Sequence, residues 1–202
     1  MAETQTRGRG RRGRIWHDAP GASLLVSVIV RSSLPTARVP TLSLAAGVAV
    51  AEALIASGGV PARLKWPNDV LVAGRKVAGI LLERQGDVVI IGVGVNVSQR
   101  EFPGDLASRA TSIALEGGLC DREALLAAVL ATVARWRKRL EHDGFEPLRA
   151  RWMELSAMVG QRVSVDGVVG TMRGLDDEGA LLIETGTGTA RILAGDVEPA
   201  AG

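Results

Sequence analysis

The chain of 202 residues is long enough for one main domain and a small second one, and its 47% hydrophobic and 23% charged residues are typical of a globular protein. The net charge of +2 conceals a basic N-terminus, because five arginines and Glu3 give residues 1–14 a charge of +4 and leave −2 for the rest, which argues against a generally nucleic-acid-binding surface. The lone Cys120 excludes an internal disulfide and suits the cytoplasm, and no unbroken apolar run approaches the roughly 20 residues of a membrane span.

The N-terminal segment alternates arginine with glycine. Residues 2–14 read AETQTRGRGRRGR. Glycine lets the backbone approach a ligand closely, and arginine offers forked donors for phosphate or carboxylate. A solvated RNA-binding tail of Arg-Gly type has the same composition. Because the run is short and leads directly into Ile15-Trp16 and a strand, we expect an ordered loop.

A strand, a helix and a second strand follow. The β-branched run at residues 24–31 predicts a buried strand. Thr41 is the expected N-cap of a helix that continues to about residue 57 and ends at Gly58-Gly59. A further strand is predicted at residues 62–66. The apolar face expected for the helix consists of Leu44, Val48, Ala51 and Ile55.

The stretch Lys65-Trp66-Pro67-Asn68-Asp69 ends that second strand. Proline, asparagine and aspartate together favour a turn, and a plain turn is one interpretation. However, Lys65 would place an ammonium at the end of a buried strand, where a partner is needed. An anionic ligand is the partner that we expect.

Two turns then predict consecutive antiparallel strands. Ala73-Gly74 lies between VLV and KVAGILLE, and residues 85–87 precede VVIIGVGVNV. This is not the alternating pattern of a parallel doubly wound sheet. Gly92 and Gly94 fall on one face of their strand and leave a groove for a flat group, although a β-bulge or close helix packing is an equal alternative.

The remaining chain predicts two helices and a small β module. Asp121 caps a helix, a second helix covers about residues 146–153, and short strands begin near residue 159. We therefore expect an α+β fold in two domains, residues 1–156 and 157–202. The core stripe predicted for the first of these helices is Leu125, Val129, Val133, Trp136 and Leu140.

Four blocks in this order resemble biotin protein ligases. They are GRGRRGR-x-W at residues 8–16, KWPNDV at 65–70, KVAGILLE at 76–83 and GVGVN at 92–96. The C-terminal module is similar to the small SH3-like domain of that family. The resemblance implies a mixed, largely antiparallel sheet with helices, of the class II synthetase-like biotin/lipoate ligase fold, followed by an SH3-like β-barrel.

The resemblance also implies a two-step, ATP-dependent and AMP-forming reaction. Biotin is converted with ATP to biotinyl-5′-AMP, and the biotinyl group is transferred to a lysine of a biotin carboxyl carrier protein or domain of acetyl-CoA carboxylase. The substrates are ATP and biotin, with Mg²⁺. The implied catalytic residues are Lys65 and Arg11. Implied biotin-binding residues are Gln5, Gly8, Arg9, Gly10, Arg11, Lys65, Gly79, Gly92 and Gly94; implied ATP- or adenylate-binding residues are Arg9, Arg11, Arg14, Trp16, Lys65, Asn68, Asp69 and Asn96.

These residue types suit that chemistry. Both substrates are anionic, so Lys65 would offset the charge collecting around the α-phosphate. Trp16 would stack on adenine, with core packing as the alternative, and the amide of Asn96 matches the donor and acceptor edge of adenine. Asn68 and Asp69 would either position Lys65 or bind magnesium.

The chain also departs from the family. Relatives begin with a further strand and helix that carry a Ser/Thr-Asn motif for biotin, and we expect this chain to lack that segment and one wall of the biotin pocket. We also expect no N-terminal helix-turn-helix and therefore no nucleic-acid partner. The sequence leaves open whether the protein forms a homodimer. The alternatives to an active ligase are a binding-only truncated relative and an Arg-Gly nucleic-acid-binding protein.

Overall fold

The larger part of the chain is built on one antiparallel sheet. The structure, a computed structural model, describes residues 1–200. The sheet has the order β1-β5-β4-β3-β2, with every pairing antiparallel. The strands are β1 (Ser23–Arg31), β2 (Arg63–Lys65), β3 (Asp69–Val72), β4 (Arg75–Gln85) and β5 (Val88–Asn96). The predicted turns at Ala73-Gly74 and at residues 85–87 are confirmed, and the positive φ angles at Ala73 and Gly74 are 48° and 76°.

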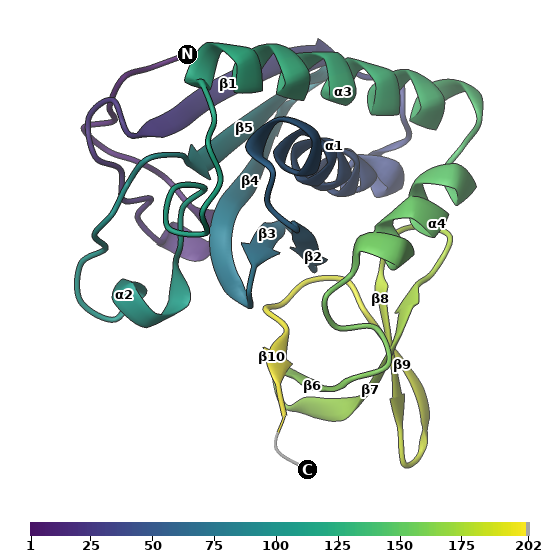
Figure 1. The fold of residues 1–202 in the computed structure, drawn as a ribbon. Coiled ribbons are helices and arrows are strands. Elements are labelled where there is room, and N and C mark those ends of the chain that lie inside the picture. Colours follow the sequence, from purple (N-terminus) through teal and green to yellow (C-terminus); the bar gives the residue numbers. More distant parts are fainter. Residues whose placement is uncertain (201–202) are drawn as a thin grey trace.

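Helices α1, α3 and α4 cover one face of this sheet (Figure 1), and the arginine loop lies on the other. The helices are α1 (Thr41–Gly58), α2 (Leu106–Arg109), α3 (Arg122–His142) and α4 (Glu146–Leu155), with short 3₁₀ turns η1 (Arg11–Gly13) and η2 (Thr36–Arg38). The α3 prediction is confirmed, because all five residues of its predicted stripe are buried and the Asp121 side chain accepts a hydrogen bond from Ala124 N at 3.1 Å.

Helix α1 forms the centre of the core. It packs against α3, α4 and strands β2 to β4, so it is buried nearly all round and has no single apolar face. The predicted stripe was therefore wrong at Ile55, which is 41% exposed. Thr41 was also wrongly predicted as the N-cap: it is the first helical residue, and its hydroxyl donates to Arg38 O at 2.6 Å.

One helical segment, Thr36–Gly58, passes a length and hydropathy test for a membrane span. Its mean hydropathy is 1.8, and 72% of the tested stretch is buried inside the protein. That burial is the environment of a core helix.

The carboxylate of Glu52 ties α1 to the two other long helices. It accepts hydrogen bonds from Arg135 Nη2 at 2.6 Å, Trp136 Nε1 at 2.8 Å and Arg151 Nε at 2.8 Å. The Glu52 side chain is only 18% exposed, and its donor Trp136 is buried, whereas Arg135 and Arg151 are 59% and 35% exposed and can bind water instead.

Glu52→Ala should therefore destabilise the fold by about 1 to 2 kcal/mol, because it leaves the buried Trp136 Nε1 without its acceptor. Urea unfolding would measure this. Glu146→Ala is the matched control, because Glu146 is 69% exposed and within residues 1–200 pairs only with Arg149; it should cost less than about 1 kcal/mol. Equal losses in the two variants would contradict the role given to Glu52.

The C-terminal part is a second antiparallel sheet in the order β10-β6-β7-β8-β9. Its strands are β6 (Arg162–Val165), β7 (Val168–Leu175), β8 (Leu181–Thr185), β9 (Gly188–Ile192) and β10 (Glu198–Pro199). The predicted domain boundary lies between the end of α4 and the start of β6. The C-terminal part contacts the first part directly. Trp66 Nε1 donates to Gly179 O, between β7 and β8, at 3.2 Å, and Ala157 N, just after α4, donates to Leu64 O at 2.8 Å.

Candidate active site

A cavity of about 130 Å³ lies between the arginine loop and the helix-free face of the five-stranded sheet. The arginine loop is defined here as residues 5–16. Its backbone is ordered, because Arg9 and Ile15 form an isolated antiparallel β-bridge and Trp16 N donates to Gly8 O at 3.1 Å. The cavity is lined by Gln5, Arg7, Arg9, Gly10, Arg11, Trp16, Leu25, Val26, Ser27, Asn68, Lys76, Gly79, Ile80, Leu81, Glu83, Ile90, Gly92, Val93 and Gly94. Four basic side chains and one carboxylate therefore surround it, a balance that favours an anionic ligand.

Glycines form the floor of the cavity, and the indole of Trp16 lies on them. Gly79 of β4 pairs with Gly94 of β5. A methyl group added at Gly94 would lie 2.7 Å from the Trp16 ring, and one at Gly79 would lie 3.2 Å from it. Gly8 is equally restricted, because an added methyl would lie 2.4 Å from Trp16 O. The groove predicted from Gly92 and Gly94 thus exists, and a ring from the chain itself lies against Gly94.

Lys76 is the lysine that reaches this cavity. Its Nζ lies 2.6 Å from Asp69 Oδ1 and 5.8 Å from the centroid of the Trp16 ring. Lys65, which the sequence analysis favoured, is not among the residues lining this cavity. Burial lowers the pKa of Lys65, an effect that the neighbouring Asp69 partly offsets.

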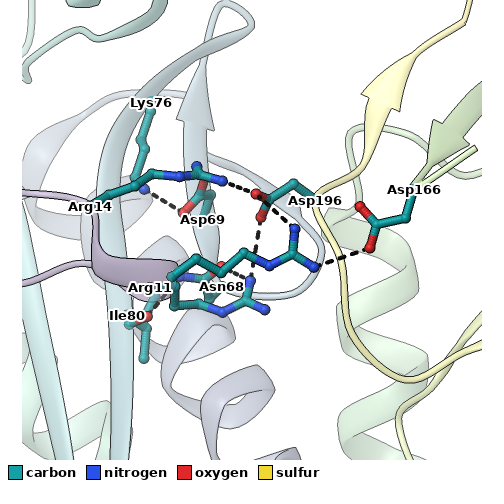
Figure 2. Close-up of polar contacts among 9 residues, drawn as sticks. Arg11, Arg14, Asn68, Asp69, Lys76, Ile80, Asp166 and Asp196 are labelled. Atoms are coloured by element: carbon teal, nitrogen blue, oxygen red, sulfur yellow. Dashed lines mark hydrogen bonds and ion pairs between the residues drawn. The ribbon is translucent and has the colours of Figure 1, made fainter.

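Arg11 is oriented by a fixed amide. Asn68 Nδ2 donates to Ile80 O at 2.8 Å, which leaves Asn68 Oδ1 to accept from Arg11 Nη1 at 2.9 Å (Figure 2). Burial lowers the pKa of Arg11, and Asp69 acts in the opposite direction. Arg11 is thus a half-buried cation held at the edge of the cavity.

Asn96 lies at the end of β5, two residues beyond Gly94 on the same face. Its Nδ2 donates to Thr111 O at 2.9 Å, whereas its Oδ1 is buried and has no hydrogen-bond partner among the described residues. Trp16 Nε1 is likewise buried without a partner there. Buried unpaired polar atoms are rare in folded proteins, and next to a cavity they indicate groups kept for a ligand. Trp16 lines the cavity, whereas Asn96, which the sequence analysis placed in the adenylate site, does not.

The structure brings together many of the predicted site residues but not all. Those that line the cavity are Gln5, Arg9, Gly10, Arg11, Trp16, Asn68, Gly79, Gly92 and Gly94. Gly8 and Arg14 line only the neighbouring groove on the outer side of the loop, and Asp69 reaches the cavity through Lys76. The sequence analysis missed Lys76 and Arg7. Lys76 begins the KVAGILLE block, so its place in that block was an available signal.

No group of three or more His, Cys, Asp or Glu side chains within residues 1–200 is arranged to hold a metal ion. Glu83 lines the cavity and pairs with Arg9, whereas Asp69 pairs with Lys76 and is 20% exposed on its side chain. A magnesium ion held mainly by phosphate oxygens needs only one or two protein carboxylates, so Asp69 fits that requirement.

Two family models match the chain. The biotin/lipoate A/B protein ligase family model matches residues 1–96, and the biotin protein ligase C-terminal domain model matches residues 159–198. The biotin–[acetyl-CoA-carboxylase] ligase of Mycobacterium tuberculosis is 39% identical over 98% of this chain and 77% of that protein. The corresponding ligase of Paracoccus denitrificans is 36% identical over 98% of this chain and 88% of that protein.

Longer relatives and solved structures agree with this match. The bifunctional ligase/repressor BirA of Bacillus subtilis is 36% identical over 98% of this chain, which spans 65% of that protein. The biotin protein ligase from Aquifex aeolicus in complex with biotin and ATP superposes with a TM-score of 0.87 at 33% identity, covering 97% of this chain and 85% of that one.

Proposed function

We propose that this chain, which belongs to the biotin/lipoate A/B protein ligase family, activates biotin with ATP and transfers it to a lysine of a biotin carboxyl carrier protein. One observation carries the proposal. A cavity with four cations is closed on one side by an aromatic ring on a glycine floor, and the buried indole nitrogen of that ring has no hydrogen-bond partner among the described residues. That combination suits a nucleotide and a carboxylate together.

In the first step a carboxylate oxygen of biotin attacks the α-phosphorus of ATP. The bond to the β-phosphate oxygen breaks, giving biotinyl-5′-AMP and pyrophosphate. Lys76 and Arg11 offset the negative charge that gathers at the α-phosphate, since both lie at the cavity wall. Asp69 and Asn68 hold these two cations in place. Magnesium would be held mainly by the ATP phosphates, with Asp69 as a candidate protein carboxylate, and would add positive charge at those phosphates.

In the second step the amine of the carrier lysine attacks the carboxyl carbon of the adenylate. The bond to the phosphate oxygen breaks, AMP leaves, and the amine loses a proton as the amide forms. The loop keeps water from the anhydride between the two steps. Trp16 supports the adenine ring, Asn96 Oδ1 accepts from its exocyclic amine, and Gln5 with the β4 and β5 glycines borders the biotin side.

The arginine loop also bears on the alternative of an RNA-binding tail. Arg9, Arg11, Arg12 and Arg14 each have a carboxylate within 4.0 Å, so they are not free to follow a nucleic-acid backbone. An ordered loop beside a cavity favours the ligase. A location in the cytoplasm and a carrier protein as partner belong to the same proposal.

Exchange of labelled pyrophosphate into ATP tests the first step. We expect the exchange to require biotin and not to be supported by lipoate, because the reaction is reversible only when the correct acid occupies the cavity. A folded protein that binds ATP but shows no biotin-dependent exchange would favour the binding-only alternative and contradict the proposal.

Gly94→Ala tests whether the position of the Trp16 ring against Gly94 matters for ATP binding. Because the new methyl group would lie 2.7 Å from the ring, Trp16 must move, and we expect the KM for ATP to rise about tenfold, within the range of one lost base-stacking contact. Gly92→Ala is the matched control on the same strand and face. Its methyl group meets only Leu81, at 3.4 Å, so the KM for ATP should change less than about twofold. Equal effects in the two variants would contradict stacking on Trp16.

A further inference from the structure

The arginines of the loop fall into two groups. Arg7, Arg9 and Arg11 line the 130 Å³ cavity, whereas Arg12 and Arg14 do not. Both of the latter reach across to carboxylates of the C-terminal part, which lie 154 and 182 residues further along the chain. This division separates Arg14 from the ligand-binding role that its place in the sequence suggested.

Arg12 pairs with Asp166, in the turn between β6 and β7. Arg12 Nη2 lies 3.1 Å from Asp166 Oδ2. Both residues have left-handed backbones, with φ angles of 54° and 45°, a conformation that is uncommon for residues other than glycine. Because the two side chains are 46% and 58% exposed, this pair alone contributes little.

Asp196, between β9 and β10, is the stronger anchor. It forms an ion pair with Arg14, and its carboxylate oxygens lie 3.6 Å from Arg11 Nη1 and 4.0 Å from Arg12 Nη1 (Figure 2). Its side chain is 26% exposed, and the next residue, Val197, is fully buried in the core. Three guanidinium groups thus converge on one carboxylate that the C-terminal sheet holds in place.

We propose that Asp166 and Asp196 are positioning residues that dock the arginine loop on the C-terminal domain, and that this docking retains the reactive adenylate. Arg12 and Arg14 dock the loop without lining the cavity, whereas Arg11 both contacts Asp196 and lines the cavity. The C-terminal domain thereby acts as the support of the loop that closes the cavity. The consequence for the adenylate rests on the proposed function, whereas the docking itself can be measured without any ligand.

Hydrogen exchange of the loop in the ligand-free protein tests the docking. The amides of Gly10 and Trp16 donate within the loop, at 2.7 and 3.1 Å, so they report its order. In the Asp166→Asn/Asp196→Asn double variant we expect these amides to exchange about three- to tenfold faster, on the scale of losing a small ion-pair network. Exchange in α1 and α3 should not change, which would show that the fold is intact.

Three comparisons separate docking from a general loss of charge. Asp177→Asn removes a carboxylate of the same domain that has no ion pair among the described residues, and it should leave loop exchange unchanged. Asp196→Glu keeps the charge and should stay near the parent. Raising NaCl from about 0.05 to about 0.5 M should speed loop exchange in the parent but not in the double variant.

Equal loop exchange in the parent and the double variant would overturn the docking. The second part of the proposal is tested by the labelling of bystander lysines with biotin and ATP, which should rise several-fold in the double variant. Faster loop exchange without additional labelling would overturn the retention of the adenylate by the C-terminal domain.

Discussion

Replacing Lys76 with alanine should slow the formation of biotinyl-5′-AMP on the order of 10²-fold or more, the scale of losing one preorganised group that stabilises the developing charge. Lys76 Nζ lies at the cavity wall between Asp69 and the face of Trp16. An ammonium at that point can offset the charge of both the carboxylate and the α-phosphate. Single-turnover formation of the adenylate measures the effect.

Lys65→Ala is the control for this prediction. Lys65 is on the neighbouring strand β2, where it pairs with Asp69, and it carries the same charge without lining the cavity, so its loss should slow the reaction less than the loss of Lys76 does. Because Lys76→Ala leaves Asp69 without its ion pair, the thermal unfolding of the variant must match that of the parent. A larger loss in Lys65→Ala than in Lys76→Ala would contradict the assignment and restore the one made from sequence.

Arg11→Gly should release the adenylate on the order of 10²-fold faster, because it removes a charged, forked donor whose side chain is only 26% exposed. Arg11 borders the cavity and contacts both Asn68 and Asp196, so its loss opens the loop and removes a phosphate partner together. The dissociation of preformed biotinyl-5′-AMP and the labelling of a bystander protein both report this.

Arg12→Gly is the matched control for Arg11→Gly. The backbone of Arg12 is left-handed, which glycine adopts without strain, and the side chain does not line the cavity. Its loss should raise the release of adenylate only several-fold, through weaker docking of the loop. Similar release from the two variants would contradict a direct contact between Arg11 and the adenylate.

Elements with one solvent-facing side were predictable from the sequence. The stripe of α3 is correct in every position, because its other face is charged and the 3.6-residue period is therefore visible. Helix α1 has no such contrast. It is buried on nearly all sides, so its sequence carries no period that would mark the exposed position of Ile55.

The choice between the two lysines depended on a detail that the sequence does not specify. The register between β3 and β4 shifts between Val70 and Leu71, so Asp69 pairs with Gly79 while Leu71 pairs with Lys76. A shift of one residue moves a side chain to the other face of a sheet. The shift brings Lys76 opposite Leu71 and onto the face of Asp69, which Lys65 shares because it pairs with Asp69. Motif spacing alone therefore could not show that Lys76 also reaches the cavity.

The partners of the loop arginines were also beyond sequence reasoning. The composition predicted that the arginines would meet anions, and this holds for the four that have carboxylate partners. It could not predict that Asp166 and Asp196 would supply two of the partners, because these pairs arise only when the C-terminal sheet packs beside the cavity.

Transfer of biotin to an isolated biotin carboxyl carrier domain by this polypeptide tests the central claim most directly. We expect labelling of one carrier lysine that requires both ATP and biotin, with one AMP and one pyrophosphate formed for each biotin transferred. A carrier domain with that lysine replaced by arginine should not be labelled. Folded protein that binds biotin and ATP but leaves the intact carrier unlabelled would contradict the account.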